Sequence, residues 1–143
     1  MKLKMPDWLK SLFGPRRRLL PGDDQEFDAA EYIQHRLDLF MKEKRPYLQP
    51  HYTLKELSES IKVPAYQLSA IVNLRKGMNF SDYLNKLRVH HCLELIKGAK
   101  NRKINVSELA TGCGFRNRNT FTNAFKKFTG RTPSEYIKQH EKK

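Results

Sequence analysis

The sequence predicts an all-α protein, and three observations lead to that prediction. Apolar residues recur with the helical period of 3.6 in several segments, and no segment alternates as a strand would. Residues that favour helix starts precede several of these segments. After Pro50 a motif repeats at a spacing of about 52 residues, which indicates a supersecondary unit used twice. We expect about seven helices, with two helix-turn-helix units bridged by a long central helix.

Residues 1–26 are predicted to form a basic arm or linker ahead of a domain that covers 27–143. Four apolar residues of the arm have helical spacing: Met5, Trp8, Leu9 and Leu12. A short amphipathic helix at a membrane or phosphate surface is one interpretation, and a solvated tail whose Trp8 packs on the domain is the other. The arm lacks the apolar run of a signal peptide, and no window approaches a membrane span.

The first strong helical pattern covers 28–44. Acidic residues crowd its start and basic residues its end, which suits the helix dipole. Pro46 is expected to end it. The predicted inner face consists of Ala30, Ile33, Leu37, Phe40 and Met41.

The repeat then appears in two pairs of matching segments. "TLKELSESIKV" (53–63) aligns with "NVSELATGCGF" (105–115), and in each a capping residue precedes Glu by three positions. "GMNFSDYL" (77–84) aligns with "GRTPSEYI" (130–137). Each unit is therefore predicted to be helix, tight turn, helix. The expected helix pairs are 54–60 with 65–75, and 106–111 with 117–128.

Punctuating residues support the turns between these helices. Lys62 and Val63 form the first turn, and Pro64 suits the first position of the next helix. Gly112 and Gly114 supply the second turn, where a positive φ carries little steric cost.

A long helix over 80–97 is expected to join the units. Its predicted inner face consists of Phe80, Leu84, Leu87, His91 and Leu95. A final helix begins at Thr132, with Pro133 in its first turn and Glu135 closing a capping box. The resulting division is 27–78 for the first unit with its leading helix, 79–98 for the linker helix and 99–143 for the second unit.

The charge of the chain favours a polyanionic partner. There are 28 basic and 15 acidic residues, and the net charge is +13. Residues 98–143 carry 11 basic and only 3 acidic side chains, so most of the excess lies in the last third. Nucleic acid or an anionic membrane surface would suit such a chain.

The helix over 117–128 has two different faces. Its inner stripe is apolar: Phe121, Ala124, Phe125 and Phe128. Its other face carries amides, a hydroxyl and basic groups, with no acid between Arg116 and Ser134. Asn can pair with adenine, Arg with guanine, and a Thr methyl can contact thymine, so this face suits base edges. Lysines and arginines at its edges suit phosphates.

The helix over 65–75 repeats this geometry with fewer polar groups. Leu68, Ile71 and Val72 form its inner stripe. Its outer face offers few hydrogen-bond donors, and Arg75 and Lys76 stand at its end. We therefore expect the second unit to dominate base contacts, while the first contributes apolar contact, shape and phosphate binding.

The segment from about 47 to 139 resembles the AraC-type DNA-binding domain of bacterial transcription regulators. The match lies in "TLKELS", "NFSDYLNKLR", "NVSELATGCGF" and "NTFTNAFKKFTGRTPSEY". The resemblance implies two helix-turn-helix subdomains whose second helices enter successive major grooves. By position, it implies base contacts from Arg118, Asn119, Thr122, Asn123, Tyr66, Ser69, Ala70 and Asn73. The predicted phosphate contacts are Arg75, Lys76, Arg88, Arg116, Lys126, Lys127 and Arg131. Family members usually have a basic residue where Asn123 stands, and Ser where Pro64 stands.

The expected partner is double-stranded promoter or operator DNA, with both half-sites within reach of a monomer. RNA polymerase is a further expected partner, as is an N-terminal sensor domain that this chain does not contain. We expect a bacterial, cytoplasmic, nucleoid-associated protein, or one on the cytoplasmic side of a membrane within a longer protein. The alternatives are a basic module that docks on a protein or membrane surface, and the output domain of a membrane-bound sensor.

Catalytic and metal chemistry find little support. His90, His91, Cys92 and Cys113 match no structural zinc spacing. No paired carboxylates, nucleophile constellation or nucleotide-binding glycine motif stands out. We expect no enzyme activity, no catalytic residue, no metal and no cofactor. Two cysteines make no disulfide framework, so reduced thiols are expected, with Cys92 as a small buried side chain.

Overall fold

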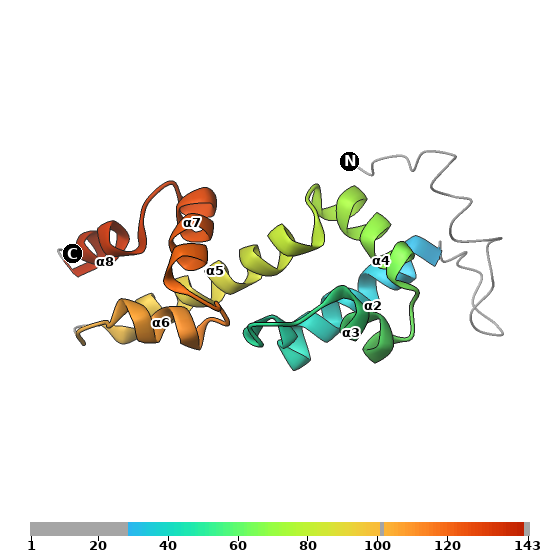
Figure 1. The fold of residues 1–143 in the computed structure, drawn as a ribbon, viewed down its shortest axis with the longest axis horizontal. Coiled ribbons are helices and arrows are strands. Elements are labelled where there is room, and N and C mark those ends of the chain that lie inside the picture. The colour runs from blue at the N-terminus through green and yellow to red at the C-terminus, as the bar shows by residue number, and fades with distance from the viewer. Residues whose placement is uncertain (1–28, 101, 142–143) are drawn as a thin grey trace. The chain divides into compact units, whose positions relative to one another are not determined.

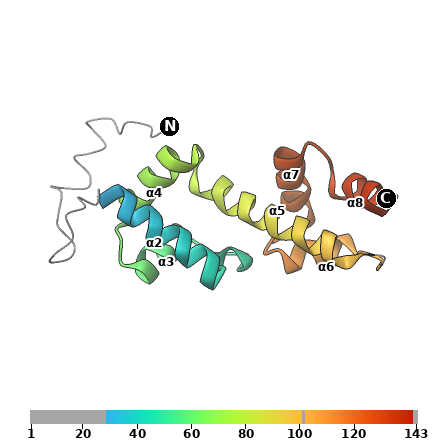
Figure 2. The same cartoon turned by 180° about the vertical axis from the view of Figure 1, so that it is seen from behind.

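The computed structural model describes residues 29–100 and 102–141 and contains only helices and connecting turns within them (Figures 1 and 2). Its seven α-helices are α2 (Ala29–Lys44), α3 (Leu54–Ile61), α4 (Ala65–Ile71), α5 (Phe80–Ala99), α6 (Val106–Gly112), α7 (Arg118–Thr129) and α8 (Pro133–Glu141). A 3-10 turn, η1 (Pro46–Leu48), and a π-helical segment, η2 (Val72–Lys76), complete them. The all-α prediction is thus confirmed. The predicted arm over 1–26 lies outside the described residues.

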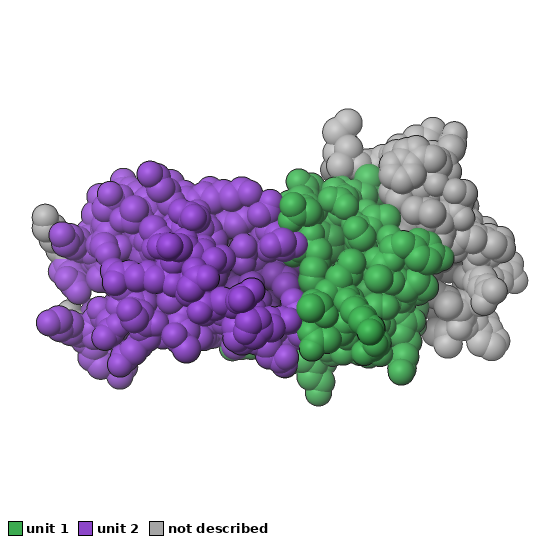
Figure 3. All heavy atoms as spheres, in the orientation of Figure 1, with its two compact units in different colours: residues 1–45, 53–80 green, residues 46–52, 81–143 purple. Residues whose placement is uncertain are grey.

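The described chain forms two compact units (Figure 3). Unit 1 contains residues 29–45 and 53–80, and unit 2 contains 46–52 together with 81–100 and 102–141. This division differs from the predicted one, because 46–52 and nearly all of α5 group with the second unit. None of the helices in the described part combines the length and apolarity that crossing a bilayer requires.

Unit 1 is built from α2, α3 and α4, which pack against one another. The predicted face of α2 is buried at Ala30, Ile33, Leu37 and Met41, while Phe40 is half-buried. The predicted inner stripe of α4 is also confirmed, since Leu68, Ile71 and Val72 are fully buried.

Local hydrogen bonds set the ends of α3. Its capping box is complete: Thr53 N donates to Glu56 Oε2 at 2.7 Å, and Glu56 N donates to Thr53 Oγ1 at 3.2 Å. Lys62 ends the helix in the left-handed region, with φ of 58°. The capping residues of the first repeat therefore do what the sequence predicts.

The second helix of unit 1 departs from the predicted single helix over 65–75. Pro64 occupies the N-cap and makes no side-chain capping bond, and α4 ends at Ile71. The chain continues as the π-helical η2 and stops at Gly77, which has φ of +70°. The wider π turn rotates the residues after Ile71 away from the α-helical register, so the outer face is not one continuous α-helical stripe.

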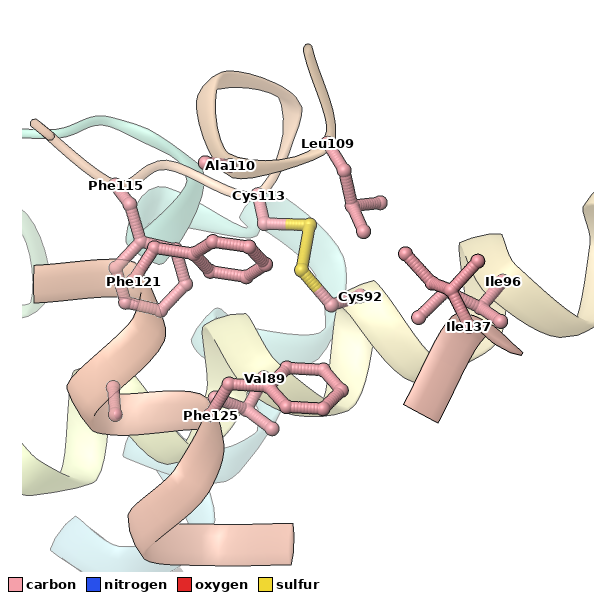
Figure 4. Close-up of a cluster of buried hydrophobic side chains, with 11 residues drawn as sticks. Val89, Cys92, Ile96, Leu109, Ala110, Cys113, Phe115, Phe121, Phe125 and Ile137 are labelled. Carbon is pink, nitrogen blue, oxygen red and sulfur yellow. A yellow bond between two sulfur atoms is a disulfide. The ribbon is translucent and has the colours of Figure 1, made fainter. Parts of the chain in front are cut away.

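Unit 2 is organised around a buried aromatic and aliphatic cluster (Figure 4). The ring centroids of Phe115 and Phe121 are 5.1 Å apart, those of Phe121 and Phe125 are 5.8 Å apart, and Phe125 and Tyr136 are 5.6 Å apart. Tilted and edge-on rings at these separations are favourable arrangements for aromatic pairs. This cluster fixes α7 through its inner face.

The face that α5 turns to the core differs from the prediction. Of the five predicted residues only Leu84 is buried, and Leu95 is 42% exposed. The buried residues are Tyr83, Leu84, Arg88, Val89, Cys92 and Ile96. Aliphatic side chains occur on several sides of this helix, so helical period alone does not identify the buried one. Packing against the cluster of unit 2 selects Val89, Cys92 and Ile96.

Cys92 and Cys113 are joined in a disulfide within this cluster (Figure 4). Both residues are fully buried, and their Cα atoms are 5.8 Å apart. The bond ties α5 to the residue that caps α6. The expected burial of Cys92 is confirmed, whereas the expectation of reduced thiols is wrong for this structure. Two cysteines far apart in the chain carry no pattern that predicts such a pairing.

Gly114 is the turn residue with the tightest surroundings. Its φ is +88°, as predicted for this turn, and a Cβ built there would lie 2.5 Å from Tyr47 O and 2.8 Å from Leu48 C. The 46–48 segment is thus packed directly on the turn between α6 and α7. Gly112, the other predicted turn glycine, is instead the last residue of α6.

Candidate nucleic-acid interface

The helix α7 begins one residue later than predicted, because Asn117 caps it. Asn117 Oδ1 accepts a hydrogen bond from Thr120 N at 2.8 Å, and its backbone is extended. Arg118 is therefore the first helical residue, and Gly130 ends the helix with φ of +82°. A capped start of this kind holds the first turn, and so the direction of Arg118 and Asn119, in place.

The two faces of α7 follow the prediction. Phe121, Ala124 and Phe125 are buried, and Phe128 is half-buried against the same cluster. The predicted base-contact residues lie outside: Arg118, Asn119 and Asn123 are exposed, and Thr122 is half-buried. The structure therefore presents this predicted set on one accessible helix.

The corresponding residues of unit 1 offer less. Tyr66 is 58% exposed, while Ser69 and Ala70 are half-buried. Asn73 is exposed, but its Nδ2 donates to Ser69 O at 2.9 Å. A side chain that binds its own helix has fewer donors for a base edge. The difference between the two helices is thus larger than composition alone predicts.

The predicted phosphate contacts fall into three groups. Arg116, Lys126 and Arg131 are exposed, and Arg75 is half-buried. Lys76 and Lys127 are ion-paired: Lys76 Nζ lies 2.8 Å from Asp38 Oδ1, and Lys127 Nζ lies 2.9 Å from Asp82 Oδ2. Arg88 forms the third group, because it is buried.

Arg88, a predicted phosphate contact, has its guanidinium hydrogen-bonded inside unit 2. Nε donates to Tyr47 O at 2.6 Å and Nη2 to Gln49 O at 3.0 Å. Nη1 donates to Asn85 Oδ1 at 3.0 Å, and the guanidinium carbon lies 5.8 Å from the ring centre of Phe115. Only 7% of the residue is exposed, and this desolvation lowers the pKa of Arg88 from its ordinary value. Arg88 therefore anchors residues 47–49 within unit 2.

A hollow of about 230 Å³ lies beside α7. Asp82 and Asn85 of α5 line one part of it. The rest of its lining comes from Thr120, Asn123, Ala124, Lys127 and Phe128. One predicted base-contact residue, Asn123, and one predicted phosphate contact, Lys127, thus share a surface with an acidic side chain.

Sequence reasoning missed two residues of this surface. The signal for Asn117 was present, because Asn directly before an apolar-periodic segment is a preferred N-cap. For Asp82 there was no signal, since its partner Lys127 lies 45 residues away in the chain.

Comparison with known proteins places this chain in a family. A family model described as "Helix-turn-helix domain" matches residues 57–139. An HTH-type transcriptional regulator of Escherichia coli (strain K12), YijO, is 32% identical over 100 residues, which cover 67% of this chain and 34% of that protein. The HTH-type transcriptional activator RhaR of Yersinia pseudotuberculosis serotype O:1b (strain IP 31758) is 28% identical over 100 residues, covering 70% and 33%.

A solved structure has a similar fold. A protein of unknown function from Listeria innocua superposes with a TM-score of 0.61 and 30% identity, covering 76% of this chain and 96% of that one. The chain spans about a third of the length of the curated relatives it matches. Its repeated helix-turn-helix units, its motifs and these matches agree, and the chain belongs to the AraC-type family of helix-turn-helix proteins.

Proposed function

We propose that this chain binds double-stranded DNA sequence-specifically and acts in transcription regulation. The observation that carries the proposal is α7, which is fixed by buried rings on one side and exposes Arg118, Asn119 and Asn123 on the other. Guanidinium and amide groups held on a rigid, acid-free helix suit the donor and acceptor pattern of the major groove. The transcriptional regulators among its relatives support the same function.

The second helix of each unit is proposed to enter one of two successive major grooves. In this arrangement α7 reads bases through Arg118, Asn119, Thr122 and Asn123. The helix α4 contributes mainly apolar contact from Tyr66, with smaller parts for Ser69, Ala70 and Asn73. Arg75, Arg116, Lys126 and Arg131 bind phosphates and set the register. Two units in one chain would let a monomer span both half-sites.

The wider setting follows from the family. We propose a bacterial cytoplasmic regulator with no enzymatic role, which contacts RNA polymerase and responds through a separate sensor domain. The curated relatives extend well beyond the matched segment, which supports a division between a binding module and further domains.

Selection of binding sites from randomised duplexes tests the proposal. The expected result is an enriched motif, and a salt titration on that motif should show a steep loss of affinity. The enriched motif should also be bound at least about a thousandfold more tightly than random DNA at physiological salt. Equal affinity for every duplex would contradict sequence-specific binding.

Single substitutions test the assignment of the two helices. Replacing Arg118 or Asn119 with Ala should weaken binding to the selected site by about 1–3 kcal/mol, because a base contact is lost. Ser69→Ala is the matched control in unit 1 and should cost less than about 0.5 kcal/mol. A greater sensitivity at Ser69 would reverse the proposed roles of α4 and α7.

A further inference from the structure

Two adjacent lysines at the end of α7 have different surroundings. Lys126 is exposed and makes no ion pair within the described part of the chain. Lys127 Nζ donates a hydrogen bond of 2.9 Å to Oδ2 of Asp82, an acidic residue in the first turn of α5. The two side chains of this pair are 58% and 30% exposed. Lys126 therefore adds a positive charge to the surface, whereas the Asp82–Lys127 pair adds no net charge.

The Asp82–Lys127 pair lies on the surface proposed to face DNA. Both residues line the hollow beside α7, together with Asn123 and Thr120. A lone carboxylate here would be repelled by a phosphate backbone. In the pair with Lys127 the negative charge of the carboxylate is neutralised, and the lysine ammonium is already bound to an anion.

A paired lysine contributes little to phosphate binding. Lysine strengthens DNA binding by neutralising a phosphate and releasing its condensed counterion. To do so, Lys127 would have to leave Asp82, and the carboxylate would then face a polyanion without this lysine beside it. An exposed ion pair is weak by itself, but this repulsion adds to the cost of breaking it.

We propose that Asp82 is a specificity-determining positioning residue, which holds Lys127 against α5 and away from the DNA backbone. This inference rests on the proposed DNA-binding function. Phosphate contacts supply essentially all non-specific affinity. By withdrawing one of them, Asp82 lowers binding to random DNA and leaves discrimination to the base-contact residues of α7.

The test is a salt titration of four variants of the full chain on the selected site and on random duplex. Lys126→Gln should reduce the slope of log K against log [salt] by about 0.9, the value of one phosphate contact. Lys127→Gln should leave the slope unchanged. Asp82→Asn should increase it by about 0.9, because Lys127 is released, and should tighten binding to random DNA about five- to tenfold near 0.1 M salt. The Asp82→Asn, Lys127→Gln double variant should return to the wild-type slope.

A charge-matched control separates the pair from net charge. Glu108→Gln removes one exposed acid elsewhere in unit 2 and should change the slope by much less than Asp82→Asn. Thermal unfolding of each variant checks that α5 keeps its start, since Asp82 lies in its first turn.

Two results would overturn the inference. One is a loss of slope in Lys127→Gln equal to that in Lys126→Gln, and the other is a gain in Glu108→Gln equal to that in Asp82→Asn. Either can occur while Arg118→Ala still weakens site-specific binding, which would leave the proposed function intact. Failure of the wild-type chain to prefer any duplex would instead remove the proposed function itself.

Discussion

Units 1 and 2 share one helical plan but complete it differently. In unit 1 the second helix has seven α-helical residues and is followed by a π-helical segment. Its N-cap residue, Pro64, makes no side-chain capping bond. In unit 2 it is a twelve-residue α-helix that starts at the Asn117 cap. The repeat therefore keeps the order of the helices, while the length, capping and outer residues of the second helix vary. Different residues of the same motif therefore determine the helical architecture and the groups proposed to contact bases.

The units also differ in what supports them. Unit 1 relies on aliphatic packing and the Thr53 capping box. Unit 2 adds a disulfide, the close contact at Gly114 and the buried guanidinium of Arg88. We interpret these additional interactions as holding α7 more rigidly in unit 2. This is the helix proposed to make most of the base contacts.

The strongest test of this contrast is alanine at matched turn glycines. Gly114→Ala should destabilise unit 2 by at least about 3 kcal/mol, because a Cβ would collide with backbone atoms and φ is positive. Gly77→Ala in unit 1 meets open space and should cost only about 1 kcal/mol. Urea unfolding followed by circular dichroism measures both. Equal losses would mean that the 46–48 segment gives unit 2 no special support.

The disulfide offers a comparable test without changing the sequence. It closes a loop over a separation of 21 residues, for which chain entropy gives about 3 kcal/mol. Adding dithiothreitol should lower the unfolding free energy by that order and speed hydrogen exchange in α5–α7 more than in α2–α4. The Cys92→Ala, Cys113→Ala variant should not respond to the reductant. Unchanged exchange in wild-type α5–α7 would show that this bond does not strengthen unit 2.

Arg88 should matter for stability and not for phosphate binding. Arg88→Met keeps the apolar stem but leaves Tyr47 O and Gln49 O without their donors, at a cost of about 2–4 kcal/mol. Chemical denaturation gives this loss, and the salt slope of DNA binding should stay unchanged under conditions where the variant is folded. If Arg88→Met kept normal stability but reduced the salt slope of DNA binding, Arg88 would be a phosphate contact.

The smallest expected effect concerns helix starts. Asn117→Ala removes the bond to Thr120 N and should cost unit 2 about 1 kcal/mol. Pro64→Ala removes no capping bond and should change unit 1 by about 0.5 kcal/mol or less. Thermal unfolding compares them. If Pro64→Ala proved the more damaging, the difference in capping would not explain the difference between α4 and α7.

The parts of this molecule that follow local rules were predictable. Helical period identified the buried faces of α2 and α7, and cap residues identified the start of α3. The prediction of the buried face of α5 was wrong because aliphatic residues occur all around this helix. Only packing in the folded unit determines which of them are buried. Arg88 and Asp82 act through partners 41 and 45 residues away, so no local pattern reports their roles. The disulfide was missed for the same reason.

The placement of residues 46–52 has a consequence for how the chain is made. These residues pack in unit 2, yet they precede α3 and α4 of unit 1 in the sequence. During translation they leave the ribosome before the rest of their unit, and at roughly 5–20 residues per second they wait several seconds for α6 and α7. Unit 1 can fold during that interval. A fragment that begins at Ser81 would never receive the carbonyls that hold Arg88, so an isolated second unit needs 46–52 supplied as a separate peptide or joined at a new terminus.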